Sequence, residues 1–477
     1  MTKTISEVFN TEQFRNAGHK LVDLLSEYLD KAKAGEEMPV LNWQDPDQQV
    51  EFWKSYKLDG DDITPFFADV LSNSIHLHHP KYMGHQVAPP APVSALADFL
   101  GAILNNGMVG YEMGSVTTAM EKLVIQCFTD ALGYGDEGDG FLTSGGTLAN
   151  LTALLSARKA FVNRDIWEEG SNTEKLAVMV SSEAHYCIDR AVRIMGLGAE
   201  GILPIKVNAD FQMNTELLEE TWQKAKERGL HVFAIIGSAC TTASGSYDDL
   251  EVIAAFAGKK NIWFHVDGAH GAAVIFSEKY IHLVNGINQA DSVVIDCHKM
   301  LMTPALTTTL LYKKSDHSYH TFQQDAHYLW QQQADPEWYN YGKRTFECTK
   351  LMMSLKFFTI MKVHGIEVLG ENVTILYDLA RTFAKLIHQR ERFELAMEPQ
   401  SNIVCFRLFD SKLTKQELND LNARVRKEIL HDGEFYIVQT TLKGTIYLRT
   451  TLINPFTTEE HLTALLDKIE GVDIRVN

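Results

Sequence analysis

Residues 262–270 read Ile-Trp-Phe-His-Val-Asp-Gly-Ala-His, a short apolar run that ends in an aspartate followed by two small residues. An apolar run of this length, bounded by turn-forming residues, is typical of a strand buried on both faces. Four similar runs occur elsewhere in the chain, with helical patterns between them: 176–180, 232–236, 292–295 and 307–312. This alternation predicts an α/β fold with a mostly parallel sheet.

Composition and charge exclude several classes of protein. The chain has 477 residues, 45% hydrophobic and 22% charged, as expected for a globular protein and not for a disordered or collagen-like one. Its 62 acidic and 44 basic residues give a formal charge of −18, which repels nucleic acid and anionic membranes. Six scattered cysteines without a Cys-x-x-Cys pair favour a reducing compartment. With no visible signal peptide or long apolar run, we expect a cytoplasmic protein without nucleic-acid or membrane partners.

The pattern of apolar residues differs between three segments of the chain. An apolar stripe from Phe14 to Leu29, preceded by Asn10 and Gln13 at capping-box spacing, predicts an amphipathic helix that packs on its own chain or on a second subunit. After Leu355, long helical patterns are followed by strand-like runs at 403–408, 436–439 and 445–452 and a helix at 457–469, which indicate a small α+β domain. We expect an N-terminal helical segment (1–75), a large domain (76–355) and a small C-terminal domain (356–477).

Reactive side chains follow two of the predicted strands. Lys299 comes just after the run 292–295, where partial desolvation lowers the pKa of an amine and allows it to attack an aldehyde. Asp267 can hold a ring nitrogen protonated, and Ala269 leaves room for a flat ring. Taken singly, a lysine at such a position is more often a solvated loop residue, and an aspartate there more often caps a turn. His265, Asp267 and His270 are also candidate metal ligands.

Further polar groups are expected at the same sheet edge. Gly146 and Thr147 open a predicted helix, whose N-terminus can bind a phosphate. His185 follows the run 176–180 with a ring able to stack, and Thr241 follows the run 232–236. Because ligands of open α/β sheets bind beyond the carboxyl ends of the strands, these groups should meet. A phosphate cup, a stacking ring, an acid and an amine are the parts that pyridoxal 5′-phosphate (PLP) requires.

Five motifs carry a family resemblance. In order they are Thr-Ser-Gly-Gly-Thr (143–147), Ser-Glu-Ala-His-Tyr (182–186), Ser-Ala-Cys-Thr-Thr (238–242), His-Val-Asp-Gly-Ala (265–269) and Asp-Cys-His-Lys-Met (296–300). From about residue 79 to about residue 466, the chain resembles the group II PLP-dependent amino-acid decarboxylases. The resemblance implies the PLP-dependent transferase fold (aspartate-aminotransferase-like, type I) with a seven-stranded sheet, and a homodimer with shared active sites.

The resemblance also implies roles for individual residues. Lys299 is implied to bind the cofactor aldehyde, Asp267 to pair with the ring nitrogen, His185 to stack on the ring, and Tyr328 to protonate the substrate carbon. The implied cofactor contacts are Gly146, Thr147, His185, Thr241, Asp267, Ala269, His298 and Lys299, and no metal is implied. Arg449 matches the arginine that holds the substrate α-carboxylate.

The substrate is indicated less directly. His85 and Gln86 lie in a segment that resembles the pocket-lining strand of the family, where aromatic-specific relatives carry aromatic residues. These polar side chains favour an acidic amino acid, which would be converted to its amine and CO2. Diamino, aromatic and aliphatic amino acids remain alternatives, as do an oxidative PLP-dependent aldehyde synthase, a metal hydrolase and a catalytically idle binding protein.

One departure from the family concerns the cofactor site. Several relatives carry Asn-Pro before the His-Lys pair, where this chain has Asp296 and Cys297. A carboxylate beside a bound phosphate is repulsive unless it points away.

Overall fold

The computed structural model describes residues 5–35, 38–58, 60, 62–170, 174–319, 321–322 and 337–472. Its contacts divide the chain into two compact units. Unit 1 comprises residues 1–85, 381–396 and 404–477, and unit 2 comprises residues 86–380 and 397–403. The division into three domains at residues 75 and 355 stays a prediction.

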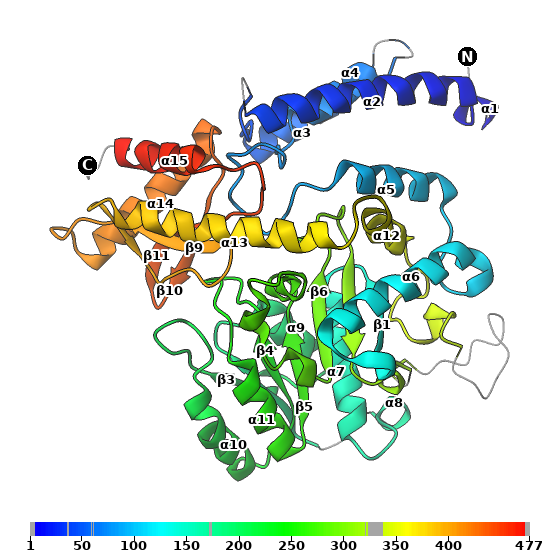
Figure 1. The fold of residues 1–477 in the computed structure, drawn as a ribbon, viewed down its shortest axis with the longest axis vertical. Helices are drawn as coiled ribbons and strands as arrows, with labels where there is room; N and C mark the ends of the chain where they lie inside the picture. Colours follow the sequence, from blue (N-terminus) through cyan, green and yellow to red (C-terminus); the bar gives the residue numbers. More distant parts are fainter. Residues whose placement is uncertain are drawn as a thin grey trace. The chain divides into compact units, whose positions relative to one another are not determined.

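Unit 2 is built on a seven-stranded sheet (Figure 1). The strands are β1 (Asp139–Thr143), β2 (Leu176–Ser181), β3 (Ile202–Ile205), β4 (His231–Ser238), β5 (Trp263–Asp267), β6 (Ser292–Asp296) and β7 (Thr308–Tyr312). Their order is β1-β7-β6-β5-β4-β2-β3, and β7 runs antiparallel to both of its neighbours while the pairs from β6 to β3 are parallel. The predicted α/β class with a mostly parallel sheet is confirmed.

Helices cover both faces of this sheet. They are α5 (Pro92–Leu104), α6 (Tyr111–Leu132), α7 (Gly146–Phe161), α8 (Ile166–Glu169), α9 (Tyr186–Ile194), α10 (Leu218–Glu227), α11 (Leu250–Lys260), α12 (Met353–His364) and the first part of α13 (Glu367–His388). Helices α7 and α9 pack together on one face of the sheet, and α10 and α11 lie on the other (Figure 1).

Burial explains why these strands read as continuous apolar runs. Every residue of β1, β2, β5, β6 and β7 is buried. Val178, Phe233 and Val294 from three strands form one core with Ala153 and Leu154 of α7. Small side chains on α7 allow the helix to lie close to the sheet, which brings its N-terminus to the carboxyl ends of the strands.

Unit 1 contains the N-terminal helices α1 (Ile5–Val8), α2 (Thr11–Ala34), α3 (Pro46–Ser55) and α4 (Thr64–Ser72). The Asn10 side chain accepts hydrogen bonds from the amides of Glu12 and Gln13, each 3.0 Å long, and so caps α2. Gly35 ends α2 with φ of 70°. The predicted amphipathic helix is confirmed.

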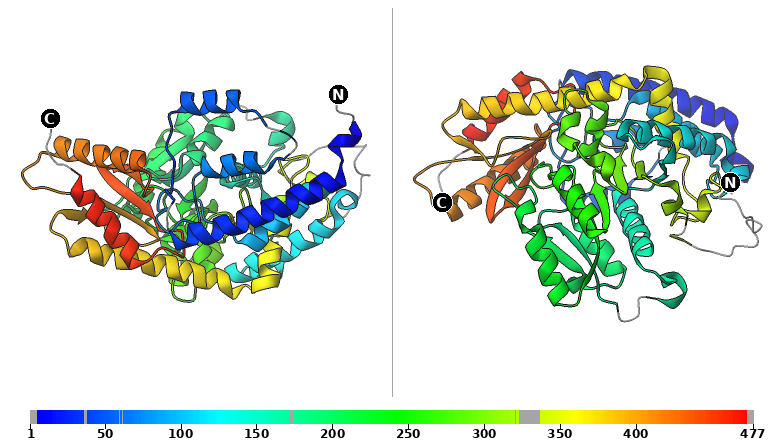
Figure 2. Two further views of the ribbon diagram at one scale, coloured as in Figure 1. Left: turned by 90° about the horizontal axis from the view of Figure 1, so that it is seen from above. Right: turned by 60° about the horizontal axis from the view of Figure 1, so that its bottom comes forward.

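Unit 1 also contains most of a four-stranded sheet, ordered β10-β11-β9-β8. The strands are β8 (Phe393–Leu395), β9 (Ile403–Leu408), β10 (Val438–Leu442) and β11 (Thr445–Thr451), accompanied by α14 (Lys415–Asp432) and α15 (Glu459–Gly471) (Figure 2). The sequence patterns missed α14 and β8, and the strand expected at 436–439 begins only at Val438. Among the described residues, no helix has both the length and the apolar character needed to cross a bilayer.

Candidate active site

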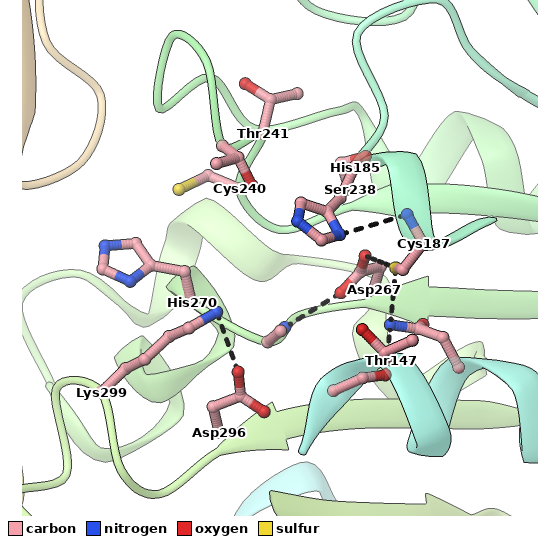
Figure 3. Close-up of a pocket in the computed structure, with 14 residues that line it drawn as sticks. Thr147, His185, Cys187, Ser238, Cys240, Thr241, Asp267, His270, Asp296 and Lys299 are labelled. Carbon is pink, nitrogen blue, oxygen red and sulfur yellow. Dashed lines mark hydrogen bonds and ion pairs between the residues drawn. The ribbon is translucent and has the colours of Figure 1, made fainter. Parts of the chain in front are cut away.

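A cavity of about 180 Å³ lies in unit 2, where the carboxyl ends of its strands meet (Figure 3). Its walls come from the turns and helix starts that follow β1, β2, β4, β5 and β6. The lining residues are Gly146, Thr147, Asn150, His185, Cys187, Ser238, Cys240, Thr241, Thr242, Asp267, Ala269, His270, Asp296 and Lys299. The predicted motifs therefore do converge on one edge of the sheet.

The turn between β1 and α7 is shaped to receive an anion. Gly145 has φ of 109°, a conformation that side-chain-bearing residues rarely adopt. A Cβ atom on Gly146 would lie 3.3 Å from an Asp296 carboxylate oxygen and 3.5 Å from the Ala269 Cβ. The absence of a side chain thus keeps this space open in front of the first amides of α7, and the Thr147 hydroxyl adds a second kind of donor.

Asp267 and His185 occupy neighbouring strand ends. Asp267 is the last residue of β5 and is 8% exposed, and its Oδ1 accepts the Ala269 amide at 3.3 Å. His185 caps α9 and accepts the Cys187 amide at Nδ1, 3.3 Å away. Burial lowers the pKa of His185, so the ring is neutral near pH 7 and suited to stacking. Figure 3 shows this ring on the cavity side of Asp267.

Lys299 projects into the same cavity, but its electrostatic state differs from the sequence-based expectation. Burial alone would lower its pKa, yet the Asp296 carboxylate 2.8 Å from Nζ and the nearby Asp267 raise the pKa above the ordinary lysine value. The expected fall in the pKa was wrong because the sequence pattern did not reveal that ion pair. Attack on an aldehyde therefore requires the amine to give up a proton.

The Asp296 carboxylate does not point away from the Gly145–Gly146 turn, since its oxygens lie beside Gly146. Its charge is compensated instead. The carboxylate pairs with Lys299, accepts the Thr308 hydroxyl at 2.5 Å and lies 3.8 Å from His298 Nε2. Although burial opposes ionisation, Lys299 holds the pKa of Asp296 below its usual value.

The other predicted cofactor residues are distributed unequally. Thr241 and Ala269 line the cavity, and the Thr241 hydroxyl is 2.7 Å from Ser244 Oγ. His298 is not among the residues that line it. Its Nδ1 lies 2.9 Å from the Thr307 carbonyl oxygen. Tyr328 lies outside the described residues.

The predicted substrate residues are not among those that line the cavity. His85 and Arg449 belong to unit 1, and Gln86 is the first residue of unit 2. Arg449 lies on β11, is buried, and donates to the Thr451 hydroxyl at 3.3 Å. Their roles toward a substrate stay predictions.

The metal-site alternative finds no support in the described part of the chain, where no cluster of three or more histidine, cysteine or acidic side chains could hold an ion. His265 is 2.7 Å from Asn150 Oδ1 and 2.8 Å from Ser292 Oγ. His270 Nε2 is 2.7 Å from Asn402 Oδ1. These histidines serve as hydrogen-bonding groups within the fold.

Seven residues that line the cavity were not assigned as cofactor contacts from the sequence: Asn150, Cys187, Ser238, Cys240, Thr242, His270 and Asp296. Asn150 lies one helical turn after Gly146, so that spacing was the signal that could have placed it on the same face of α7. Cys187 had only its position two residues after His185 to indicate a role.

A comparison with protein families decides the identity. Residues 57–409 match the model of the pyridoxal-dependent decarboxylase conserved domain. The chain belongs to this family. It is a PLP-dependent amino-acid decarboxylase, as the motifs predicted.

Individual relatives differ in their named substrates. The aromatic-L-amino-acid decarboxylase of Bacillus atrophaeus is 28% identical over 470 residues, covering 97% of this chain and 96% of that protein. The human acidic amino acid decarboxylase GADL1 is 28% identical over 475 residues, covering 95% and 91%. The structure of the glutamate decarboxylase domain of diaminobutyrate-pyruvate transaminase and L-2,4-diaminobutyrate decarboxylase from Vibrio parahaemolyticus has a TM-score of 0.84, 27% identity, and coverage of 96% and 94%.

The donor set of this decarboxylase fits PLP. The open space at Gly146, the first turn of α7 and Thr147 suit the phosphate, and Asp267 suits a protonated ring nitrogen. Lys299 supplies the amine for the aldehyde. The Asp296 carboxylate beside Gly146 is compatible with this arrangement because its charge is balanced within the site.

Buried His265 gives a prediction for the pH dependence of stability. Burial lowers the pKa of His265 to about 4, whereas an unfolded histidine titrates near 6.5. Between these values the unfolded state binds the extra proton, so the free energy of unfolding falls as the pH drops from about 6.5 to about 4, by about 3 kcal/mol for this residue. Denaturant unfolding at pH 7, 5.5 and 4.5 should show a shallower fall for His265→Gln than for the native chain. Parallel curves would contradict the prediction.

Proposed function

We propose that the preferred substrate of this decarboxylase is an acidic L-amino acid, namely glutamate, aspartate or cysteine sulfinate, which is converted to its amine and CO2. The observation that carries the proposal is the positive environment of His85. Partial burial and the nearby cations Arg449 and Arg426 lower the pKa of His85, so the ring stays neutral beside two guanidinium groups. Since Arg449 is assigned below to the α-carboxylate that every amino-acid substrate carries, Arg426 is the cation that favours a further anionic group on the substrate side chain.

Gln86 supports the same preference. Its side-chain Nε2 is buried and has no hydrogen-bond partner among the described residues. A buried donor without an acceptor is costly, and a carboxylate or sulfinate oxygen would satisfy it. An aromatic or aliphatic side chain would leave it unpaired.

The names of the relatives do not separate the alternatives. Acidic, aromatic and diamino substrates occur among proteins of nearly equal identity to this chain. Decarboxylation of a diamino, aromatic or aliphatic amino acid, or oxidative formation of an aldehyde, is therefore the competing outcome of the test below.

We assign a role in the reaction to each of the main residues as follows. Lys299 would hold PLP, and the cofactor would supply an electron sink for the pair released when the Cα–carboxylate bond of the substrate breaks. Asp267 holds the proton on the ring nitrogen, and His185 and Ala269 flank the ring. We assign Arg449 to the α-carboxylate and Tyr328 to the delivery of a proton to Cα.

The function is tested by CO2 release from a panel of L-amino acids with PLP added. The panel contains glutamate, aspartate, cysteine sulfinate, tyrosine, diaminobutyrate, lysine and leucine, and oxygen uptake is followed in parallel. Release from an acidic member alone supports the proposal. Release from any other member, or oxygen uptake with aldehyde formation, overturns it.

Arg426 provides a prediction specific to the acidic side chain. Replacing Arg426 by glutamine should lower kcat/KM for the acidic substrate about 10- to 100-fold, because one charge-assisted contact is lost. The matched control is Lys427→Gln on the same helix, whose side chain is exposed. Equal effects of the two substitutions would show that Arg426 contributes only general charge.

We further propose that the enzyme is a homodimer with shared active sites. We also propose a cytoplasmic location, because its six scattered cysteines form no disulfide. Helix α5 exposes Leu96, Leu100 and Ile103 at 57%, 51% and 60%, three apolar side chains along one stripe. Helix α6 contacts α12, which contacts α5, and Val116 of α6 is 64% exposed. An apolar surface of this kind is best explained by a second copy of the chain.

A double substitution on α5 tests the dimer. Leu100→Glu with Ile103→Lys should convert the native dimer to monomer in sedimentation velocity and remove most activity. The control Gln223→Glu lies on α10, away from this stripe, and should stay dimeric. A monomeric native enzyme, or a fully active dimeric double variant, would refute the proposed interface.

A further inference from the structure

A chain of buried hydrogen bonds runs beneath the cavity and ends on Asp267. Its members are the side chains of Trp263, Ser292, His265, Asn150 and Cys187, which we call the buried hydrogen-bond chain. All five are at most 7% exposed. The donor–acceptor distances from Trp263 to Asp267 are 2.9, 2.8, 2.7, 3.5 and 3.9 Å in that order.

The donor and acceptor of each bond in the buried hydrogen-bond chain follow from groups at both of its ends. The Trp263 indole only donates, so Ser292 Oγ accepts there and gives its own proton to His265 Nδ1. On the other side, the Gly146 carbonyl only accepts, so Asn150 turns Nδ2 toward it at 2.9 Å. Asn150 Oδ1 then faces His265 Nε2, which must carry the proton of the neutral ring.

The end of the chain reaches the cofactor acid. Asn150 Nδ2 also donates to Cys187 Sγ. The Cys187 thiol in turn donates to Asp267 Oδ2 (Figure 3). Burial and the neighbouring Asp267 raise the pKa of the thiol, so it keeps the proton it donates. The other carboxylate oxygen already accepts the Ala269 amide, so the thiol fixes the second oxygen and with it the plane of the carboxylate.

We propose that Asn150 and Cys187 are positioning residues for the cofactor: they orient Asp267 toward the ring nitrogen and link that carboxylate to the turn that receives the phosphate. Asn150 donates to the Gly146 carbonyl, in the turn proposed to receive the phosphate. It also donates to Cys187, which binds the carboxylate proposed to face the ring nitrogen. Both ends of the cofactor cradle are thereby held by one buried amide. The site is preorganised before PLP arrives, which lowers the ordering cost of binding.

The test measures binding to the apoenzyme without turnover. The probe is 4′-deoxypyridoxine 5′-phosphate, which lacks the aldehyde and so cannot bond to Lys299, and its 1-deaza analogue, in which C–H replaces the ring nitrogen. Cys187→Ala should raise the Kd of the nitrogen-containing probe about fivefold. It should leave the Kd of the deaza analogue unchanged. Cys187→Ser, which keeps a donor, should bind both probes within about twofold of the native chain.

Asn150→Asp tests the donor–acceptor direction of the buried hydrogen-bond chain with an almost isosteric substitution. It replaces both donors of Nδ2 by an acceptor, so the Kd of the nitrogen-containing probe should rise about 30-fold. Thermal unfolding of each apoenzyme variant separates a loss of binding from a loss of the fold. The proposal is overturned if Cys187→Ala weakens both probes equally, if it weakens neither, or if a folded Asn150→Asp variant binds like the native chain.

Discussion

Substituting Lys299 by alanine is expected to reduce CO2 release by at least about 10³-fold, because the cavity then lacks the amine that holds the cofactor aldehyde. The variant should still fold, since Asp296 keeps its hydrogen bond from Thr308. It should be less stable, however, because a buried carboxylate loses the partner 2.8 Å away. The measurements are CO2 release, the absorbance of bound cofactor and denaturant unfolding.

Two variants sharpen this experiment. Lys314→Ala removes an exposed lysine beyond β7 and should keep full activity. Asp296→Asn combined with Lys299→Ala removes the stranded charge, so it should recover stability without recovering activity. Turnover near the native rate in Lys299→Ala would refute the assignment of this lysine.

The parts of the fold that follow from continuous apolar runs could be predicted from the sequence. β2, β4, β5, β6 and β7 lie within one or two residues of the expected runs, because strands buried on both faces leave an uninterrupted apolar signal. β3 was missed because it is short and contains Pro204. α14 was missed although Leu418, Leu421, Val425 and Ile429 recur at helical spacing after a capping box, so its sequence signal was present.

The residues of the site likewise fall into those that the sequence pattern could predict and those that it could not. Asp267, His185 and Lys299 were predictable because each follows a recognisable strand, and parallel strands bring their carboxyl ends together. The pKa of Lys299 was not predictable, because it depends on the distance to Asp296. Asn150 and Cys187 carry no motif of their own. Only the packing of α7 against β5, and of α9 against α7, brings them next to Asp267.

A second set of contacts with no sequence signal protects the edge of the large sheet. β1 is an edge strand, and side chains bind three of its backbone groups. Glu121 accepts the Leu142 amide at 2.8 Å, Lys350 donates to the Leu142 carbonyl at 2.8 Å, and Arg344 donates to the Gly140 carbonyl at 3.0 Å. These contacts satisfy an edge that would otherwise be open to pairing with another chain.

Among these side chains, Lys350 is the one whose removal should lower the free energy of unfolding most. Its side chain is 1% exposed. The ammonium group forms an ion pair with the fully buried Glu121 and lies 4.3 Å from the centroid of the Tyr341 ring. Lys350→Met would leave both the Glu121 carboxylate and the Leu142 carbonyl buried without their cation. We expect the free energy of unfolding to fall by about 3–5 kcal/mol in denaturant titrations of the apoenzyme.

The double variant Glu121→Leu with Lys350→Met distinguishes a stranded charge from lost packing. Removing both ionic partners should restore more than half of the stability lost in Lys350→Met, since the remaining deficit is the two backbone groups of Leu142. Because β1 leads directly into the Gly145–Gly146 turn, the single variant should also bind PLP more weakly. A single variant as stable as the native enzyme would show that Glu121 can be accommodated without Lys350, and the proposed protection of the sheet edge would have to be abandoned.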